Sequence, residues 1–254
     1  MRDILEAVAG GDLSPAAAEA RLRGYATGDA GRFDAARVER SGVPEAILAE
    51  GKTLEQVEEL TATSLETTNR AIVTRLDDTA PAPLREAIGA SHPDASVRLY
   101  PQAGMLVATT SDFERPQLQA TVGVVAAGSA DANAAEEAAV TAGEIGAAVR
   151  RVDDVGVASI ARLTDQLDEL RDLDVLVVAA GREGALPTVV AGLVDVPVIG
   201  LPVGTGYGHG GGGEAALAGM LQSCTALTVV NIDAGFTAGA QAGLIARRLD
   251  AARE

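Results

Sequence analysis

A carboxylate between glycines is the clearest candidate in this sequence for acid–base chemistry. Glu183 lies in the run Gly181-Arg182-Glu183-Gly184, directly after the continuous apolar segment 175–180. Glycines at this point allow a substrate to approach the backbone closely. Glu183 could instead be a solvated acid at the start of a helix, but a position directly after a buried strand favours a functional role. We therefore interpret Glu183 as a candidate base.

A second candidate loop follows the apolar segment 121–126. The backbone N–H groups around Gly128, together with the start of the next helix, could hold an anion. Ser129 would add a hydroxyl donor, and Asp131 could bind ribose hydroxyls. An equally consistent alternative is a plain strand-to-helix turn in which Asp131 caps the helix.

The glycine-rich segment 202–213 is too long to be a simple turn, and it predicts a loop that folds over a ligand. Within it, His209 fits an exposed loop histidine better than a catalytic one. Cys224 lies between a predicted helix and the last predicted strand, where a buried and inert thiol is the usual outcome. Because it is the only cysteine, an internal disulfide is excluded.

Regular alternation of strands and helices from about residue 120 onward would position these loops. Strands are predicted at 121–126, 148–152, 175–180, 198–201 and 228–231, and helices at 132–145, 160–170, 185–193, 214–221 and 237–249. Apolar runs without polar alternation are typical of strands covered on both faces. The pattern predicts an α/β fold with a doubly wound, flavodoxin-like parallel sheet, whose ligands bind at the carboxyl ends of the strands.

The first half of the chain predicts a smaller, mixed α+β domain. Helical patterns cover 2–9 and 15–23, mixed helix and short strand cover 33–40, 54–64 and 67–73, and strands cover 96–100 and 105–108. Pro81 and Pro83 are interpreted as a loop, and the polar stretch 109–119 as a linker. We therefore expect two domains, 1–118 and 119–254.

The formal net charge of −16 argues against a nucleic-acid partner, because phosphate binding needs clustered Lys and Arg. Lys52 is the only lysine, which favours a protein from a high-salt proteome over an ordinary acidic cytosolic protein. The apolar runs are too short to cross a bilayer, and the first 14 residues lack a signal pattern. We expect a cytoplasmic protein without a membrane partner.

Taken together, these loops resemble two related families that share one fold, the aminoimidazole ribonucleotide carboxylases and the LarB enzymes of nickel-pincer nucleotide cofactor synthesis. In the first comparison, Ala185 stands where the purine family carries a histidine. The LarB resemblance is closer and extends into the N-terminal half, which the purine carboxylases lack. The similar segments are 40–45, 51–56, 181–187, 207–208, 220–224 and 229–236. Ala130, Asp153 and Ala161 depart from the LarB pattern, which carries Ser, Tyr and His there.

The LarB resemblance implies that the substrate is nicotinic acid adenine dinucleotide. Carbon dioxide would carboxylate its pyridinium ring, and cleavage of its phosphoanhydride would release AMP. The resemblance implies that Cys224 adds to the ring as a thiolate and that Glu183 removes the ring proton. It also implies further substrate-binding positions: Gly128, Ser129, Asp131, Asp154, Gly156, Gly181, Gly184, Tyr207 and Gly208.

The same resemblance implies a homo-octamer. A magnesium ion bridging the two phosphates is what phosphate chemistry suggests, but the sequence has no ligand cluster specific enough to name. No organic cofactor is expected. Two alternatives stay open: a purine-type aminoimidazole ribonucleotide carboxylase or mutase, and a non-catalytic nucleotide-binding module.

Overall fold

The computed structural model describes residues 2–253; Met1 and Glu254 lie outside the described residues. Within this range the chain forms two compact units, one ending at Glu114 and the other beginning at Arg115. The border falls inside the polar stretch 109–119, slightly before the border after residue 118 that we expected. Among the residues described, no helix is both long and apolar enough to cross a membrane.

The C-terminal unit is built on a parallel sheet, which confirms the predicted doubly wound fold. Its strands are β7 (Thr121–Ala126), β8 (Ala148–Val152), β9 (Val175–Ala180), β10 (Val198–Pro202) and β11 (Thr228–Val229). They lie in the order β11-β10-β9-β7-β8, so β7 has β9 on one side and β8 on the other. The chain therefore changes direction across the sheet at β7. The topological switch point lies at the carboxyl ends of β7 and β9.

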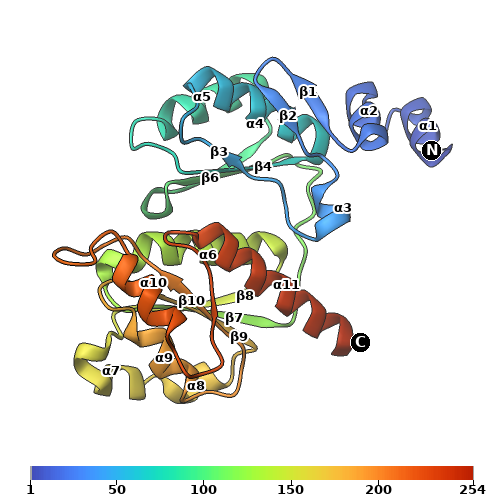
Figure 1. Ribbon diagram of the computed structural model, residues 1–254. Coiled ribbons are helices and arrows are strands. Elements are labelled where there is room, and N and C mark those ends of the chain that lie inside the picture. The colour runs from blue at the N-terminus through green and yellow to red at the C-terminus, as the bar shows by residue number, and fades with distance from the viewer. Residues whose placement is uncertain (1, 254) are drawn as a thin grey trace. The chain divides into compact units, whose positions relative to one another are not determined.

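Helices cover both faces of this sheet (Figure 1). On one face lie α6 (Ala132–Ile145) and α11 (Gly235–Arg253), which contribute mainly alanines to the core. On the other lie α7 (Ile160–Thr164), α8 (Leu167–Arg171), α9 (Ala185–Ala191) and α10 (Glu214–Leu221), which contribute larger side chains. Burial from both sides explains why the central strands are continuously apolar.

Glycines on α11 allow it to pack closely against α6. A Cβ atom on Gly239 would collide with the carbonyl of Ala138, and one on Gly235 would collide with that of Ala134. Gly243 lies in the same way against the side chain of Ile145. Residues four apart share one face of a helix, so these three glycines form one contact surface.

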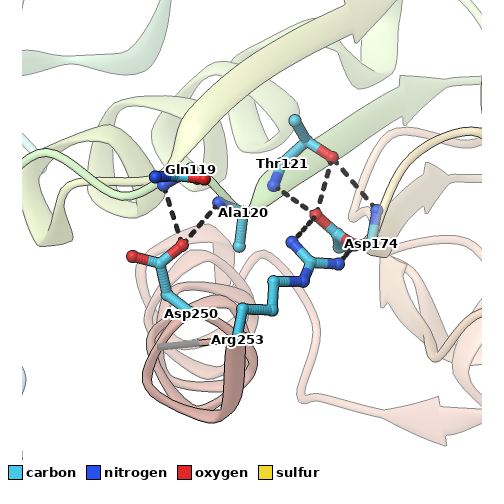
Figure 2. Close-up of polar contacts among 6 residues, drawn as sticks. All are labelled: Gln119, Ala120, Thr121, Asp174, Asp250 and Arg253. Carbon is cyan, nitrogen blue, oxygen red and sulfur yellow. Dashed lines mark hydrogen bonds and ion pairs between the residues drawn. The ribbon is translucent and has the colours of Figure 1, made fainter.

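The last turns of α11 are tied to the amino edge of the sheet (Figure 2). The Oδ1 atom of Asp250 accepts a hydrogen bond from the Gln119 N–H at 2.8 Å. Asp174, which directly precedes β9, accepts the Thr121 N–H at 2.8 Å and pairs with the guanidinium of Arg253. These contacts fix the C-terminal end of α11 at the amino edge of the sheet. The loops that were predicted to bind ligands lie at the opposite edge.

The N-terminal unit is built on a mixed sheet in the order β3-β4-β6-β5. Its elements are α1 (Arg2–Gly10), α2 (Pro15–Arg23), β1 (Ala26–Gly28), β2 (Gly31–Phe33), α3 (Arg37–Ser41), β3 (Ile47–Leu48), α4 (Leu54–Thr68), β4 (Arg70–Thr74), α5 (Pro81–Ser91), β5 (Ser96–Tyr100), the short 3₁₀ helix Pro101–Ala103 and β6 (Met105–Thr109). A capping box between Thr53 and Gln56 starts α4. Leu65 and Leu84, from α4 and α5, pack with Leu106 of β6 in the core.

Two assignments made from the sequence were wrong. Pro81 and Pro83 do not mark a loop but lie in the first turn of α5, where their missing N–H groups would have no partner within the helix in any case. The single helix expected over 160–170 is divided into α7 and α8. At the division, the Gln166 N–H bonds to the carbonyl of Leu163, three residues back, which tightens the chain and ends α7.

Candidate functional site

Asp131 joins the loops that follow β7, β9 and β10. Its Oδ2 atom accepts the Gly128 N–H at 2.9 Å, and its Oδ1 atom accepts the Gly181 N–H at 2.9 Å and the Thr205 hydroxyl at 3.1 Å. The residue is only 6% exposed. Burial raises the pKa of Asp131, and the hydrogen bonds from Thr205, Gly128 and Gly181 oppose that rise. The carboxylate thus fixes three loops at the switch point. Ribose binding by Asp131 stays a prediction.

A polar pocket of about 200 Å³ lies between the loop after β9 and the glycine-rich loop after β10. Its lining includes the side chains of Arg182, Glu183, Thr205, Tyr207 and His209. Glu183 is exposed, so its carboxylate is open to a ligand. The pocket therefore lies at the carboxyl edge of the sheet, where ligands of doubly wound folds bind.

Arg182 and Tyr207 form a stacked pair at this pocket. The guanidinium carbon of Arg182 lies 4.2 Å from the centroid of the Tyr207 ring, and its Nη2 atom donates to the Tyr207 hydroxyl at 2.9 Å. Arg182 has a φ of +51°, a left-handed conformation that is uncommon for a residue with a side chain. Such outliers cluster at active sites and ligand clamps, which marks this loop as a candidate binding loop.

Close backbone packing explains two glycines of the loop after β9. A Cβ atom on Gly181 would lie 2.5 Å from the Thr205 carbonyl oxygen. One on Gly184, which has a φ of +66°, would lie 2.5 Å from the carbonyl oxygen of Ala216 in α10. These two glycines have structural reasons to be small, while Gly208, with a φ of +84°, meets nothing within 4 Å. Their roles in substrate binding stay predictions.

The loops after β7 and β8 lie against one another. A Cβ atom on Gly156 would lie 2.8 Å from the carbonyl oxygen of Ala127. Ser129 is exposed, in the short 3₁₀ helix Ser129–Asp131 that precedes α6. Asp154 has a φ of +61° and pairs with Arg162, with 2.7 Å between Oδ1 and Nη1. The structure therefore brings Gly128 and Gly156 to one edge of the sheet, but it orients the Asp154 carboxylate toward Arg162.

The structure does not bring Cys224 to the pocket that contains Glu183. Cys224 is exposed, so the buried thiol favoured by the sequence alone is wrong; the residue lies in the turn beyond the end of α10. The next residue, Thr225, lies 3.9 Å from a Cβ atom built on Gly192, just after α9. Glu183 instead precedes α9, which is about 10 Å long at 1.5 Å per residue. Within one chain, the neighbour of Cys224 therefore lies by the end of α9 and Glu183 lies before its start, and Cys224 is not among the residues that line the pocket.

Metal ligands do not gather at the site among residues 2–253, where no group of three His, Cys, Asp or Glu side chains lies close enough together to hold a metal ion. Glu183 and His209 both line the pocket, but no further carboxylate or imidazole does. The described side chains therefore do not form a preformed magnesium cage. Magnesium is usually bound through one or two carboxylates and substrate phosphates, and its binding here stays a prediction.

Comparison with known protein families matches both halves of the chain. The AIR carboxylase family model matches residues 121–254, which is the whole of the doubly wound sheet and its helices. The model of the LarB/PurE-like N-terminal domain matches residues 25–109 in the N-terminal unit. The chain belongs to the LarB family. This family is related to the AIR carboxylases, and membership indicates a carboxylase-type enzyme.

The LarB-family assignment also extends to a relative of full length. An uncharacterized protein of Methanocaldococcus jannaschii is 35% identical over 254 residues, which cover 97% of this chain and 97% of the relative. The similarity therefore includes both units in the same order.

Sequence analysis did not single out Thr205 or Arg182. Thr205 links the Asp131 carboxylate to the pocket, and Arg182 forms one of its walls. The sequence did contain an indication for Arg182, because it directly precedes Glu183, the candidate base. A cation at that position in a loop at the carboxyl edge can contact the same ligand. Thr205 gave no such signal, since a hydroxyl among glycines is common in loops.

Proposed function

We propose that this LarB-family protein carboxylates the pyridinium ring of nicotinic acid adenine dinucleotide and hydrolyses its phosphoanhydride to release AMP, in the first step of nickel-pincer cofactor synthesis. The observation that carries the proposal is the open Glu183 carboxylate, in a LarB-like Gly-x-Glu-Gly-Ala-Leu-Pro run, at a pocket on the carboxyl edge of the sheet. The family-model matches in both halves of the chain support a carboxylase-type reaction.

The proposed reaction needs a nucleophile because a pyridinium ring is too electron-poor to attack carbon dioxide. The Cys224 thiolate adds to the ring carbon para to nitrogen, which gives a neutral dihydropyridine with an enamine. The neighbouring enamine carbon then attacks carbon dioxide and forms the new carbon–carbon bond. Its electrons come from the ring, which is an iminium again after the attack.

Glu183 then takes the proton from the carbon that has gained the carboxylate. The electron pair of that C–H bond restores the enamine, and expulsion of the Cys224 thiolate restores the aromatic ring. No external oxidant or reductant is needed, because the thiolate leaves with the electron pair it brought. The exposure of Glu183 supports this role, since a base must reach a ring that arrives from solvent.

The proposed reaction needs Cys224 and Glu183 at one ring, but Cys224 does not line the pocket that contains Glu183. If both residues act on one ring, Cys224 reaches it either from the same chain or from a second copy of the chain. A second copy is compatible with the homo-octamer that the LarB resemblance implies, since Cys224 is exposed.

Hydrolysis of the phosphoanhydride is assigned to the same bound substrate. The hydroxyl of Ser129, in the short 3₁₀ helix Ser129–Asp131 before α6, is the proposed contact for phosphate, because the Gly128 N–H already donates to Asp131. Magnesium would supply charge neutralisation for the two phosphates when bound. Glu183, the one described carboxylate that lines the pocket, is assigned to the ring proton, so no side chain is named as a ligand and no step proposed here passes through the ion.

The alternative of a purine-type carboxylase or mutase is less well supported. Ala185 occupies the position of that family's histidine, so the imidazole of the purine reaction has no counterpart there. A non-catalytic nucleotide-binding module would retain the pocket but would give no product.

Incubation of the protein with nicotinic acid adenine dinucleotide and labelled bicarbonate tests the proposal. We expect label in a pyridinium product and release of AMP in equal amounts. Glu183→Gln should slow product formation roughly a hundredfold or more, because its basic oxygen is lost while its size is kept. Glu214→Gln is the matched control, since Glu214 is an exposed acid in the first turn of α10 that does not line the pocket. Absence of labelled product with the wild type would reject the proposed reaction.

A further inference from the structure

Arg182 places a guanidinium at the pocket without a direct ion pair to an acid among the described residues. Among the described residues, no ion pair joins Arg182 to an Asp or Glu, although Glu183 is the next residue in the chain. Most other arginines of the C-terminal unit do pair with acids, as Arg150 does with Glu169. An unpaired guanidinium in a protein of net charge −16 is available for an anion that comes from outside the chain.

The contact with Tyr207 holds the guanidinium without consuming its binding capacity. One of its five N–H groups donates to the Tyr207 hydroxyl, and one face stacks on the Tyr207 ring. The remaining N–H groups lie in the plane of the guanidinium. A planar fork of this kind matches the two oxygens of a carboxylate, and stacking lowers the entropy lost when the bond forms.

We propose that Arg182 binds the ring carboxylate of the substrate and thereby selects a pyridinium carboxylate over the corresponding carboxamide. The identity of the ring rests on the proposed function, while the anion-binding role rests on the geometry of Arg182 and Tyr207. The phosphates of a dinucleotide share the same charge chemistry. The carboxylate is favoured because Arg182 directly precedes Glu183, the proposed base, so a ring presented to Glu183 lies within reach of both side chains.

Selection against an amide follows from the donors that an amide presents. A carboxamide has one oxygen acceptor, carries no charge, and turns an N–H₂ group toward the guanidinium. At least one donor of Arg182 then loses its partner, and the hydrogen bond that remains is not between opposite charges. Sites built for a hydrogen-bonding partner reject analogues that lack it much more strongly than apolar pockets reject size changes.

Calorimetric titration with nicotinic acid adenine dinucleotide and with nicotinamide adenine dinucleotide tests this inference. The two ligands have the same phosphates and differ in the ring substituent. We expect the wild type to bind the acid about tenfold or more tightly than the amide, as expected for charge-assisted bonds. Arg182→Met should reduce this preference to within about twofold by weakening the acid alone. Arg182→Lys should keep only part of it, because lysine lacks the planar fork.

Controls separate this effect from general changes in charge or folding. Arg248→Met removes an exposed arginine of α11 that does not line the pocket, and its preference should equal that of the wild type. Tyr207→Phe keeps the stacked ring but removes the hydroxyl that orients Arg182, so its preference should fall between those of the wild type and Arg182→Met. Circular dichroism checks that each variant folds.

Four results would overturn the inference. They are a wild type that binds the two dinucleotides equally, a wild type that binds neither, an Arg182→Met variant that keeps the preference, and an Arg182→Met variant that loses both ligands equally. The last result would assign Arg182 to the phosphates. Because the titration contains no carbon dioxide, failure of the carboxylation assay alone would reject the proposed reaction and leave the selectivity of Arg182 intact.

Discussion

The carboxylate of Asp131, at the start of α6, accepts the backbone N–H of Gly181, fifty residues further along the chain, with 2.9 Å between Oδ1 and N. Asp131 belongs to the loop after β7 and Gly181 to the loop after β9, so the bond crosses the topological switch point of the sheet. Gly181 directly precedes Arg182 and Glu183. The position of both pocket side chains therefore depends on a carboxylate that need not touch the substrate.

Replacement of Asp131 by Asn should impair activity more than stability. An amide has one acceptor oxygen where the carboxylate has two, so at least one of the donors Gly128, Gly181 or Thr205 loses its bond. Relief of a buried charge offsets part of that loss, and we expect the free energy of unfolding to fall by no more than about 1 kcal/mol at pH 7. Turnover should fall about tenfold or more, since misplaced groups lose catalytic orientation.

Urea unfolding and steady-state turnover of Asp131→Asn, measured together, check this prediction. Asp165→Asn, at an exposed position between α7 and α8, is the control and should match the wild type in both measurements. Wild-type turnover by Asp131→Asn would show that the bond to Gly181 does not position the loop after β9.

The contribution of Asp131 to the free energy of unfolding should change with pH in the opposite direction to that of most paired acids. Because burial raises its folded pKa above the ordinary 3.8, the fold favours the protonated carboxyl. Its contribution to stability is complete below pH 3.8 and is lost as the pH rises through the raised folded value. Relative to the wild type, Asp131→Asn should therefore become less destabilised as the pH rises above 3.8, measured by urea unfolding across that range.

The contribution of Asp174 to the free energy of unfolding should instead change with pH in the direction typical of paired acids. The hydrogen bond from Arg253 lowers its pKa below 3.8, so its contribution is complete above pH 3.8 and is lost as the pH falls through the lowered folded value. Asp174→Asn should lower the free energy of unfolding by about 1–3 kcal/mol at pH 7, because it weakens bonds from a charged partner and from Thr121. The difference from the wild type should shrink in acid. A difference that stays constant down to pH 2 would exclude ionisation of Asp174 as its cause.

Two glycine substitutions should have opposite effects on stability. Gly239→Ala would place a methyl group 2.9 Å from the backbone carbons of Ala138, and we expect it to cost about 1–3 kcal/mol through overpacking between α6 and α11. Gly89→Ala, in α5, meets nothing within 4 Å and should stabilise the N-terminal unit by about 0.5–1 kcal/mol. Denaturant unfolding with probes in each unit checks both. A neutral Gly239→Ala would mean that α11 can shift away from α6.

The fold of the C-terminal unit could be predicted from its sequence because burial leaves a simple pattern. The run Val175–Ala180 is buried at every position, and its apolar side chains identified it as a central strand. The edge strand β8 carries Arg150 and Arg151 but was recognised from its place in the alternation. Where the pattern misled, local chemistry was ambiguous: Pro81 and Pro83 are as compatible with a first helical turn as with a loop.

The candidate site was less predictable, because sequence order does not give side-chain contacts. The sequence indicated Asp131 as a helix cap or a ribose ligand, but its bond to Gly181 depends on which strands are neighbours. That neighbour relation, β7 beside β9, follows from the complete sheet and not from either loop. The stack of Arg182 on Tyr207 similarly depends on how the glycine-rich loop returns toward β9.

Replacement of Cys224 by Ser tests whether this thiol is the nucleophile of the proposed reaction. Cys224→Ser should fold and bind the dinucleotide but lose carboxylation, because a hydroxyl is much less acidic and less nucleophilic than a thiol. Near-normal turnover by this variant would remove covalent catalysis from the proposal. Because Cys224 is exposed beyond α10, we expect Cys224→Ser to unfold at the same urea concentration as the wild type.

Mixing Cys224→Ser with Glu183→Gln then asks whether the two residues come from one chain. If each site combines Cys224 of one copy with Glu183 of another, random reassembly of equal amounts gives about a quarter of the sites both native residues, since each is present with a chance of about one half. Activity should therefore recover to roughly a quarter of the wild-type value after the subunits are dissociated and reassociated. If both residues must come from the same chain, every chain in the mixture lacks one of them, and activity stays at the level of the parent variants. Recovery would show that each site takes Cys224 and Glu183 from different copies of the chain, and its absence in a mixture shown by light scattering to be reassembled would exclude a shared site.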